Sequence, residues 1–138
     1  MAQKLASRLE TFFKEKTDGD LRSIVQYEQG DFTVAYLRDD VAEQYTDDEF
    51  ADAIDDSRFE SFSAPIYDDL FSDEHGELTC LVKCFENVLE MNFVLADGVG
   101  TAVALEAEAF SETHGLVAEA RDVVVEEREQ LDETQDWD

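Results

Sequence analysis

The stretch "ELTCLVKCFENVLEMNFVLADGVGTAVALE", residues 77–106, decides the fold of this chain. It contains three runs rich in β-branched, aromatic and aliphatic residues, and such runs predict strands. Glu86-Asn87 joins the first run tightly to the second, and residues 97–100 turn the chain into the third. Because connections this short join antiparallel neighbours, the stretch predicts three consecutive strands of one antiparallel sheet.

Both cysteines of the chain lie in the first run, four positions apart. On a strand, Leu78, Cys80, Val82 and Cys84 share one face, and a rise of about 3.3 Å per residue separates the two cysteines by roughly 13 Å. A disulfide needs Cα atoms within about 7 Å, and two thiolates that share a zinc ion each lie about 2.3 Å from it. On a helix the same spacing would make them neighbours. The strand assignment therefore predicts two free, buried cysteines.

A helix and a hairpin precede this stretch. Residues 2–16 place apolar side chains at helical spacing with charged residues between them, which predicts an amphipathic helix that ends before Gly19. Its apolar positions are Leu5, Leu9, Phe12 and Phe13. Residues 22–38 contain two strand-forming runs around Gln29-Gly30-Asp31, and this arrangement predicts a β-hairpin.

Residues 39–62 return to a helical pattern, in which Thr46 followed by Glu49 predicts a capping box. The expected buried side of this helix consists of Phe50, Ala53, Ile54 and Phe62. Pro65 then marks a connector over residues 63–76. We expect its apolar side chains to pack against the domain, and these are Ile66, Tyr67, Leu70 and Phe71.

A last helix is predicted from about Ala107 to the late 120s, on the apolar residues Phe110, Val117, Ala120 and Val124. Val117, Val124 and Leu131 are spaced by seven, so they form either a seam that continues past the sheet or ordinary core residues before a frayed end. Trp137, between two aspartates, is either exposed or a docking anchor. These four residues are the candidate interaction residues. We expect a single α+β domain over residues 1–126 and an acidic tail over residues 127–138.

Charge is the outlying feature of the composition, because 36 acidic residues face 10 basic ones for a net charge of -26. Self-repulsion at this charge opposes folding in dilute buffer. Three explanations compete: a cytoplasm at molar salt, an acidic tail, or a mimic of nucleic acid that competes for basic surfaces. Acidic pairs recur along the whole chain, and Lys83 is the only lysine after residue 16. This distribution favours a halophilic cytoplasmic protein and disfavours affinity for nucleic acid or anionic membrane.

Three further features of the sequence agree with a cytoplasmic protein. No apolar run reaches the roughly 18 residues that a membrane span needs. The first 16 residues lack the continuous apolar region of a signal peptide. Two cysteines without a secretory context are typical of a reducing compartment.

No catalytic or metal-binding motif is visible. The chain has no HExxH, CxxC or GxSxG pattern, and "ADGVGTA" has neither GxGxxG nor a following lysine. His75 and His114 are the only histidines, and carboxylates are so abundant that their presence near either histidine is expected by chance. We therefore expect no enzyme, no catalytic residue, no cofactor and no metal.

The predicted order is helix, two strands, helix, three strands and helix, around one antiparallel sheet. Over residues 2 to about 126, this order resembles the Roadblock/profilin-like fold, in which helices pack on such a sheet. Separately, "YEQGDFTVAYLRDDV" and "ELTCLVKCFENVLEMNF" resemble stretches of small uncharacterised acidic proteins of halophilic archaea. Roadblock-type domains form homodimers and bind small GTPases or other scaffolds. The resemblance thus implies a regulatory interaction module, although a fold alone does not define function.

The sequence leads to one expected function and several alternatives. We expect a non-enzymatic regulatory or scaffold protein that acts by protein–protein interaction, as a homodimer with an unknown protein partner. The helical residues Val117, Val124 and Leu131 are one candidate dimer surface, and the strand over residues 88–96 is the other. A small-ligand-sensing domain is the main alternative, ahead of an acidic nucleic-acid mimic or an enzyme.

Overall fold

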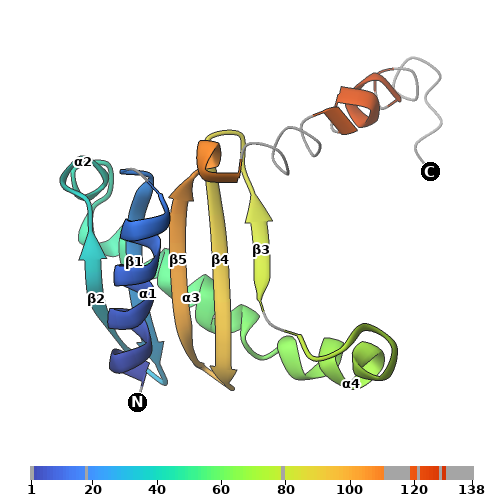
Figure 1. Cartoon of the computed structure of the whole chain (residues 1–138), viewed down its shortest axis with the longest axis horizontal. Coiled ribbons are helices and arrows are strands. Elements are labelled where there is room, and N and C mark those ends of the chain that lie inside the picture. Colours follow the sequence, from blue (N-terminus) through green and yellow to red (C-terminus); the bar gives the residue numbers. More distant parts are fainter. Residues whose placement is uncertain are drawn as a thin grey trace.

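A computed structural model of the chain describes residues 2–17, 19–78, 80–110, 119–120, 122–127 and 129. It has an α+β architecture with a single antiparallel sheet of five strands (Figure 1). The strands are β1 (Leu21–Glu28), β2 (Asp31–Leu37), β3 (Leu81–Cys84), β4 (Val88–Ala96) and β5 (Val99–Glu106). The helices are α1 (Ala2–Lys16), α2 (Asp39–Ala42), α3 (Asp47–Glu60) and α4 (Ala64–His75), followed by a short 3-10 helix η1 (Ala107–Phe110).

The sheet order is β2-β1-β5-β4-β3, so the predicted three-strand stretch forms one half of the sheet. The predicted hairpin forms the other half, and its β1 pairs with β5. Both predictions of strands are confirmed. Gly30 in the β1–β2 turn and Gly98 in the β4–β5 turn have positive φ values, where a residue with a side chain would be strained.

Helices cover the two faces of the sheet. On one face, α1 packs over the central strands, and the core there contains Ala6, Phe13, Ile24, Val103 and Leu105. On the other face, α3 packs against Val25 and Tyr27 through Ile54. Figure 1 shows α1 in front of β1 and α3 behind the sheet.

The helices between β2 and β3 differ from the prediction, because there are three of them in place of one. The predicted capping box is confirmed: the backbone N–H of Glu49 donates to Thr46 Oγ1, and the N–H of Thr46 donates to Glu49 Oε1. The residues expected in a connector form α4, with Pro65 in its first turn, where the missing N–H of proline costs no helical hydrogen bond.

The buried side predicted for residues 39–62 is only partly correct. Ile54 is buried and Phe50 is half-buried, but Ala53 and Phe62 are exposed. Phe62 lies in the turn after α3 ends, so it no longer follows the periodicity of that helix. Most of the predicted last helix lies outside the described residues, although residues 122–127 are helical. None of the described helices is long and apolar enough to cross a membrane.

Candidate interaction surface

Helix α4 presents an exposed apolar stripe. Ile66, Tyr67, Leu70 and Phe71 have relative exposures of 59%, 46%, 68% and 46%. Because 3.6 residues complete a turn, positions i, i+1, i+4 and i+5 lie on one side of a helix. The prediction that these side chains pack against the domain is wrong. Figure 1 shows α4 beyond the start of β3, clear of both covered faces of the sheet.

Large apolar side chains are also exposed at the end of α3. Phe59 is 77% exposed and Phe62 is 50% exposed. If a large side chain offers about 200 Å² of surface, the four residues of the α4 stripe alone expose roughly 450 Å². A patch of this size lies in the range of the largest apolar patch on a monomeric protein, and such patches are often functional.

The base of α4 is held by polar contacts that leave the stripe free. Ser61 is fully buried, and its Oγ accepts a hydrogen bond of 2.7 Å from the backbone N–H of Gly98 in the β4–β5 turn. Asp68 Oδ1 accepts a bond of 3.1 Å from the N–H of Leu78, after the helix ends. Ala64 in the first turn is buried. These bonds tie the turn before α4 to the β4–β5 turn and tie α4 to the segment that leads into β3, and they leave the apolar side of the helix uncovered.

A cavity of about 210 Å³ lies where α4 meets the sheet, lined by Ala64, Pro65, Asp68, Leu78, Cys80, Leu81, Asn92, Val94, Leu95 and Ala96. Cavities that enclose a drug-sized ligand have volumes of about 300 Å³ or more. The polar side chains in its lining are already engaged. Asp68 binds the N–H of Leu78, and Asn92 Nδ2 donates to the carbonyl oxygen of Ser57 and to Glu60 Oε1. This cavity therefore offers few free polar groups to a ligand.

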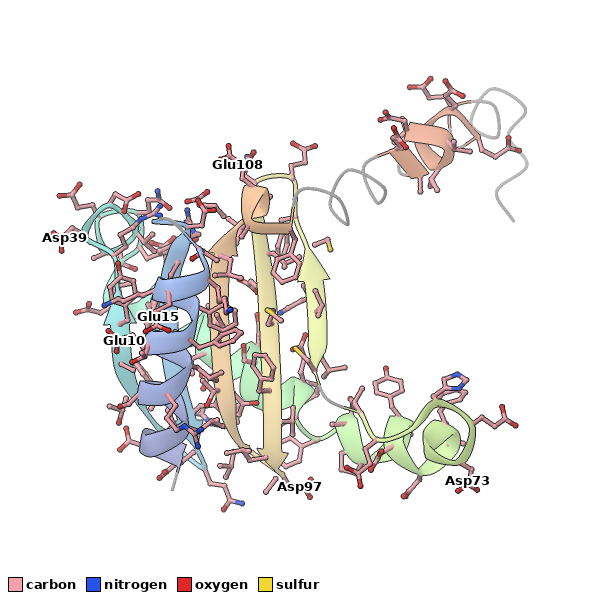
Figure 2. All side chains as sticks on the ribbon, viewed as in Figure 1. Glu10, Glu15, Asp39, Asp73, Asp97 and Glu108 are labelled. Carbon is pink, nitrogen blue, oxygen red and sulfur yellow. The ribbon has the colours of Figure 1, made fainter. Side chains whose placement is uncertain are left out.

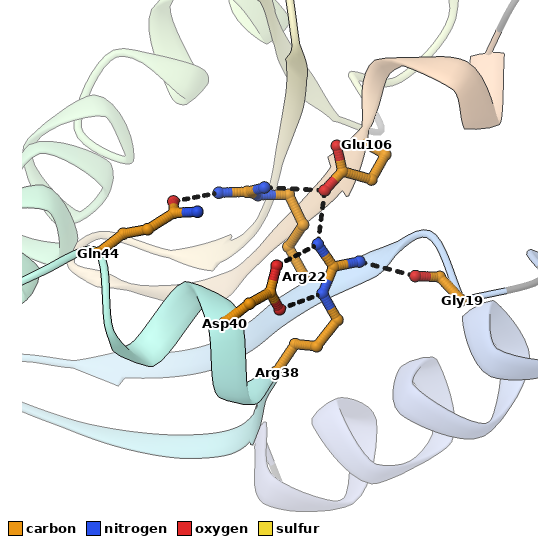
Figure 3. A network of polar contacts seen from close by, with 6 residues as sticks. All are labelled: Gly19, Arg22, Arg38, Asp40, Gln44 and Glu106. Atoms are coloured by element: carbon orange, nitrogen blue, oxygen red, sulfur yellow. Dashed lines mark hydrogen bonds and ion pairs between the residues drawn. The ribbon is translucent and has the colours of Figure 1, made fainter.

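A network of two arginines and two carboxylates lies at the end of the sheet where β5 stops (Figure 3). Glu106 Oε1 accepts bonds of 2.8 Å from Arg22 and 2.6 Å from Arg38. Arg22 also donates to Gln44, while Arg38 donates to Asp40 and to the carbonyl oxygen of Gly19. Burial would raise the pKa of Glu106, but the hydrogen bonds and charges of the two arginines outweigh it and lower that pKa. Because these groups satisfy one another, the network is structural.

Residues 7–125 match a protein family described as Domain of unknown function (DUF7522). The chain belongs to this DUF7522 family. No curated protein and no solved structure matches it. The matched residues include all five strands and α4, so the exposed stripe lies within the DUF7522 domain.

The two cysteines of this DUF7522 domain are free, as predicted, but they are not fully buried. Cys84 is exposed in β3, and Cys80, just before the strand, is half-buried. The prediction of burial is wrong because β3 is an edge strand whose Cys84 side is uncovered by the described helices. Burial raises the pKa of the Cys80 thiol.

The structure places His75 on α4, where its ring stacks on Phe71 at 5.2 Å between ring centroids. Among the described residues, no three His, Cys, Asp or Glu side chains converge as a set of metal ligands. His114 lies outside the part of the chain that the structure describes.

The predicted interaction residues are only partly placed. Val124 lies in the helical residues 122–127 and is half-exposed, whereas Val117, Leu131 and Trp137 lie outside the described residues. The alternative dimer strand, Val88–Ala96, is β4, and it pairs with β3 on one side and β5 on the other. On the β3 side the described pairing covers only Leu89–Asn92. The dimer surface on this strand therefore stays a prediction. The sequence signal for the α4 stripe was the i, i+1, i+4, i+5 spacing of its four apolar residues.

Proposed function

We propose that this DUF7522 protein is a non-enzymatic regulatory or scaffold protein that acts by protein–protein contact in a high-salt cytoplasm. The observation that carries the proposal is the exposed apolar stripe of α4. Aromatic side chains are enriched at the cores of protein interfaces, and two of the four stripe residues are aromatic. Anchoring at the base of the helix supports the proposal, because a surface already held in place loses less entropy on binding. By the Roadblock resemblance, a small GTPase is one partner class that we propose, on analogy alone.

The test is affinity capture from native extract at molar KCl, with the full chain as bait. A variant that combines Ile66→Glu and Leu70→Glu places two charges on the stripe, and both positions are exposed enough for the fold to tolerate them. Val34→Glu is the matched control, since Val34 is an exposed apolar residue of β2, the edge strand at the other side of the sheet from β3. We expect a partner that binds the wild type and the control but not the stripe variant. Equal capture by all three proteins would refute the role of the stripe.

A small-ligand-sensing domain is the second candidate, and one observation favours it. A cavity of about 270 Å³ lies between α1 and the sheet, lined by Ala6, Ser7, Gln26, Thr33 and Ala35. It too is smaller than the roughly 300 Å³ of a drug-sized site, so it would suit only a smaller ligand. Gln26 is 3% exposed, and its Oε1 has no hydrogen-bond partner among the described residues. A ligand that donates a hydrogen bond would satisfy this atom. Thermal-shift screening of small polar metabolites tests this function, and a hit should lose its stabilising effect in Gln26→Leu.

A further inference from the structure

On the sheet face that α1 partly covers, no described helix lies over β3 or the neighbouring side of β4. Val82 pairs with Met91, and Cys84 pairs with Leu89, so these side chains share that face. Lys83 points to the opposite face, where it contacts Glu60 of α3. Met91 and Phe93 pack against the core beneath α1 and are half-buried, whereas Val82 is 51% exposed. We call Val82, Cys84, Met91 and Phe93 the open sheet face. In Figure 1, none of the described helices lies in front of β3.

Positive charge borders the open sheet face. Arg8, Phe12 and Lys16 are exposed and follow one another at i, i+4 on α1. Lys14 lies over the ring of Tyr36 at 4.2 Å, on the side of β2. Because successive residues of a helix are about 100° apart, the row through Phe12 lies on the other side of α1, toward β5 and β4.

Arg8 and Lys16 differ from the other cations whose side chains the structure describes. Arg22, Arg38, Arg58, Lys14 and Lys83 each form an ion pair within the chain. Within the described part of the chain, Arg8 and Lys16 have no carboxylate at ion-pair distance. In a chain of net charge -26, two exposed cations that have no described carboxylate partner and lie beside an apolar face fit an acidic, apolar partner.

Helix α4 has the complementary character. Asp69 and Asp73, four residues apart, lie on the flank of the stripe next to Ile66. The helix thus presents an apolar stripe with an acidic border, and α1 and the sheet present an apolar face with a basic border. Within one copy they do not meet, because α4 lies beyond the start of β3, and Ser61 in the turn before it is bonded to the β4–β5 turn.

We propose that α4 of one copy docks on the open sheet face of a second copy, and reciprocally, in a two-fold dimer. This inference rests on the proposed function, since it assigns a partner to the stripe. The available apolar area favours a reciprocal contact, in which each copy docks its α4 on the other. A standard interface buries about 800 Å² per partner, and the stripe alone supplies roughly 450 Å². When each copy contributes both a helix and a sheet face, the two contacts together reach the standard size.

The experiment uses two differently tagged full-length chains, both with Cys80→Ser. One carries Leu70→Cys and Cys84→Ser, and the other keeps Cys84. The chains are mixed at tens of micromolar in molar KCl and oxidised gently, then run on a non-reducing gel. We expect a disulfide between the two tagged chains, and none when Val34→Cys replaces Leu70→Cys. Light scattering of the wild type should give twice the mass of the chain, and Ile66→Glu with Leu70→Glu should weaken the association at least tenfold.

Two outcomes would overturn the proposal. A monomeric mass excludes the second copy, and protection of Cys84 from a thiol reagent in that monomer would identify the chain's own C-terminal segment as the occupant. A dimer that links only two copies of the Leu70→Cys chain would show that the helices pair with each other. If the dimer is absent but the stripe still captures a partner from extract, the proposed dimer is wrong and the proposed function stands. If both are absent, the proposed function fails as well.

Discussion

Replacement of Glu106 by glutamine isolates the charge at the centre of the arginine network. The substitution keeps the shape of the side chain and one acceptor oxygen, but it removes the negative charge that Arg22 and Arg38 share. Arg22 is 7% exposed, so water cannot replace the lost counter-charge. Asp40→Asn is the matched control, because that carboxylate also binds Arg38 but is open to solvent.

The magnitude follows from the burial of the two partners. Breaking a buried ion pair costs about 3–5 kcal/mol. Two features reduce the loss of stability in this variant. The side chain of Glu106 is 26% exposed, and Arg22 keeps its bond to Gln44. We expect the free energy of unfolding to fall by roughly 2–3 kcal/mol for Glu106→Gln. Asp40→Asn should lose clearly less, because exposed ion pairs are screened by water and salt.

Urea unfolding at molar KCl measures this difference. With an m value of about 1–3 kcal/mol/M, the midpoint should fall by roughly 0.7–3 M. The pKa of Glu106 is lowered in the folded state, so its contribution is complete above the unfolded pKa and is lost as pH falls through the lower folded value. The difference between wild type and variant should therefore shrink below about pH 4.5. Equal midpoints for Glu106→Gln and Asp40→Asn would refute the reasoning.

Three further predictions concern the core and the thiols. A Cβ at Gly100 would lie 2.4 Å from the hydroxyl oxygen of Tyr27, so Gly100→Ala should cost roughly 1–3 kcal/mol in urea unfolding, and a wild-type midpoint would contradict this. Burial raises the pKa of Tyr27 to about 12, so stability should decline as pH rises from about 10 through 12, a decline that Tyr27→Phe should lessen. Cys84 should react with a thiol reagent faster than Cys80, whose pKa burial raises; equal rates in the two single Cys→Ser variants would exclude this difference.

The parts of the fold that the sequence predicted are those encoded locally. The strand-forming runs and tight turns of residues 77–106 determine three strands and their pairing without reference to the rest of the chain. The capping box at Thr46 depends on residues only three positions apart. The sequence does not predict the pairing of β1 with β5, because it joins residues distant in the chain, such as Leu21 with Leu105 and Tyr27 with Gly100. Hydrophobic patterns indicate which face is buried but not which strand is the neighbour.

The candidate surface was missed for two physical reasons. In the sequence Pro65 indicates a connector, although proline is also compatible with the first turn of a helix. Apolar side chains such as Leu70 were expected inside, because burial is their usual environment. Periodicity predicts that such residues share a side, but only the tertiary structure shows whether the chain itself covers that side. The same limit applies to Cys84, whose strand was predicted but whose edge position was not.

The proposed dimer should weaken as salt is lowered, because two electrostatic terms of different range compete. Each copy carries a net charge of -26, and this repulsion acts over the Debye length, which grows from about 3 Å at 1 M to about 10 Å at 0.1 M. The attraction of Asp69 and Asp73 for Arg8 and Lys16 involves only two pairs per contact at the surface, where a pair contributes about 0–1 kcal/mol. The long-range repulsion therefore dominates once screening is reduced.

Sedimentation of the full chain in a KCl series measures the association constant directly. It should fall steadily from 1 M to 0.1 M KCl, and circular dichroism at each step must show that the fold is intact. Asp69→Asn with Asp73→Asn removes part of the repulsion along with the local attraction, so the variant should dimerise with a shallower dependence on salt. An association constant that rises as KCl is lowered would mean that local ion pairs outweigh the net charge, and the balance argued here would be wrong.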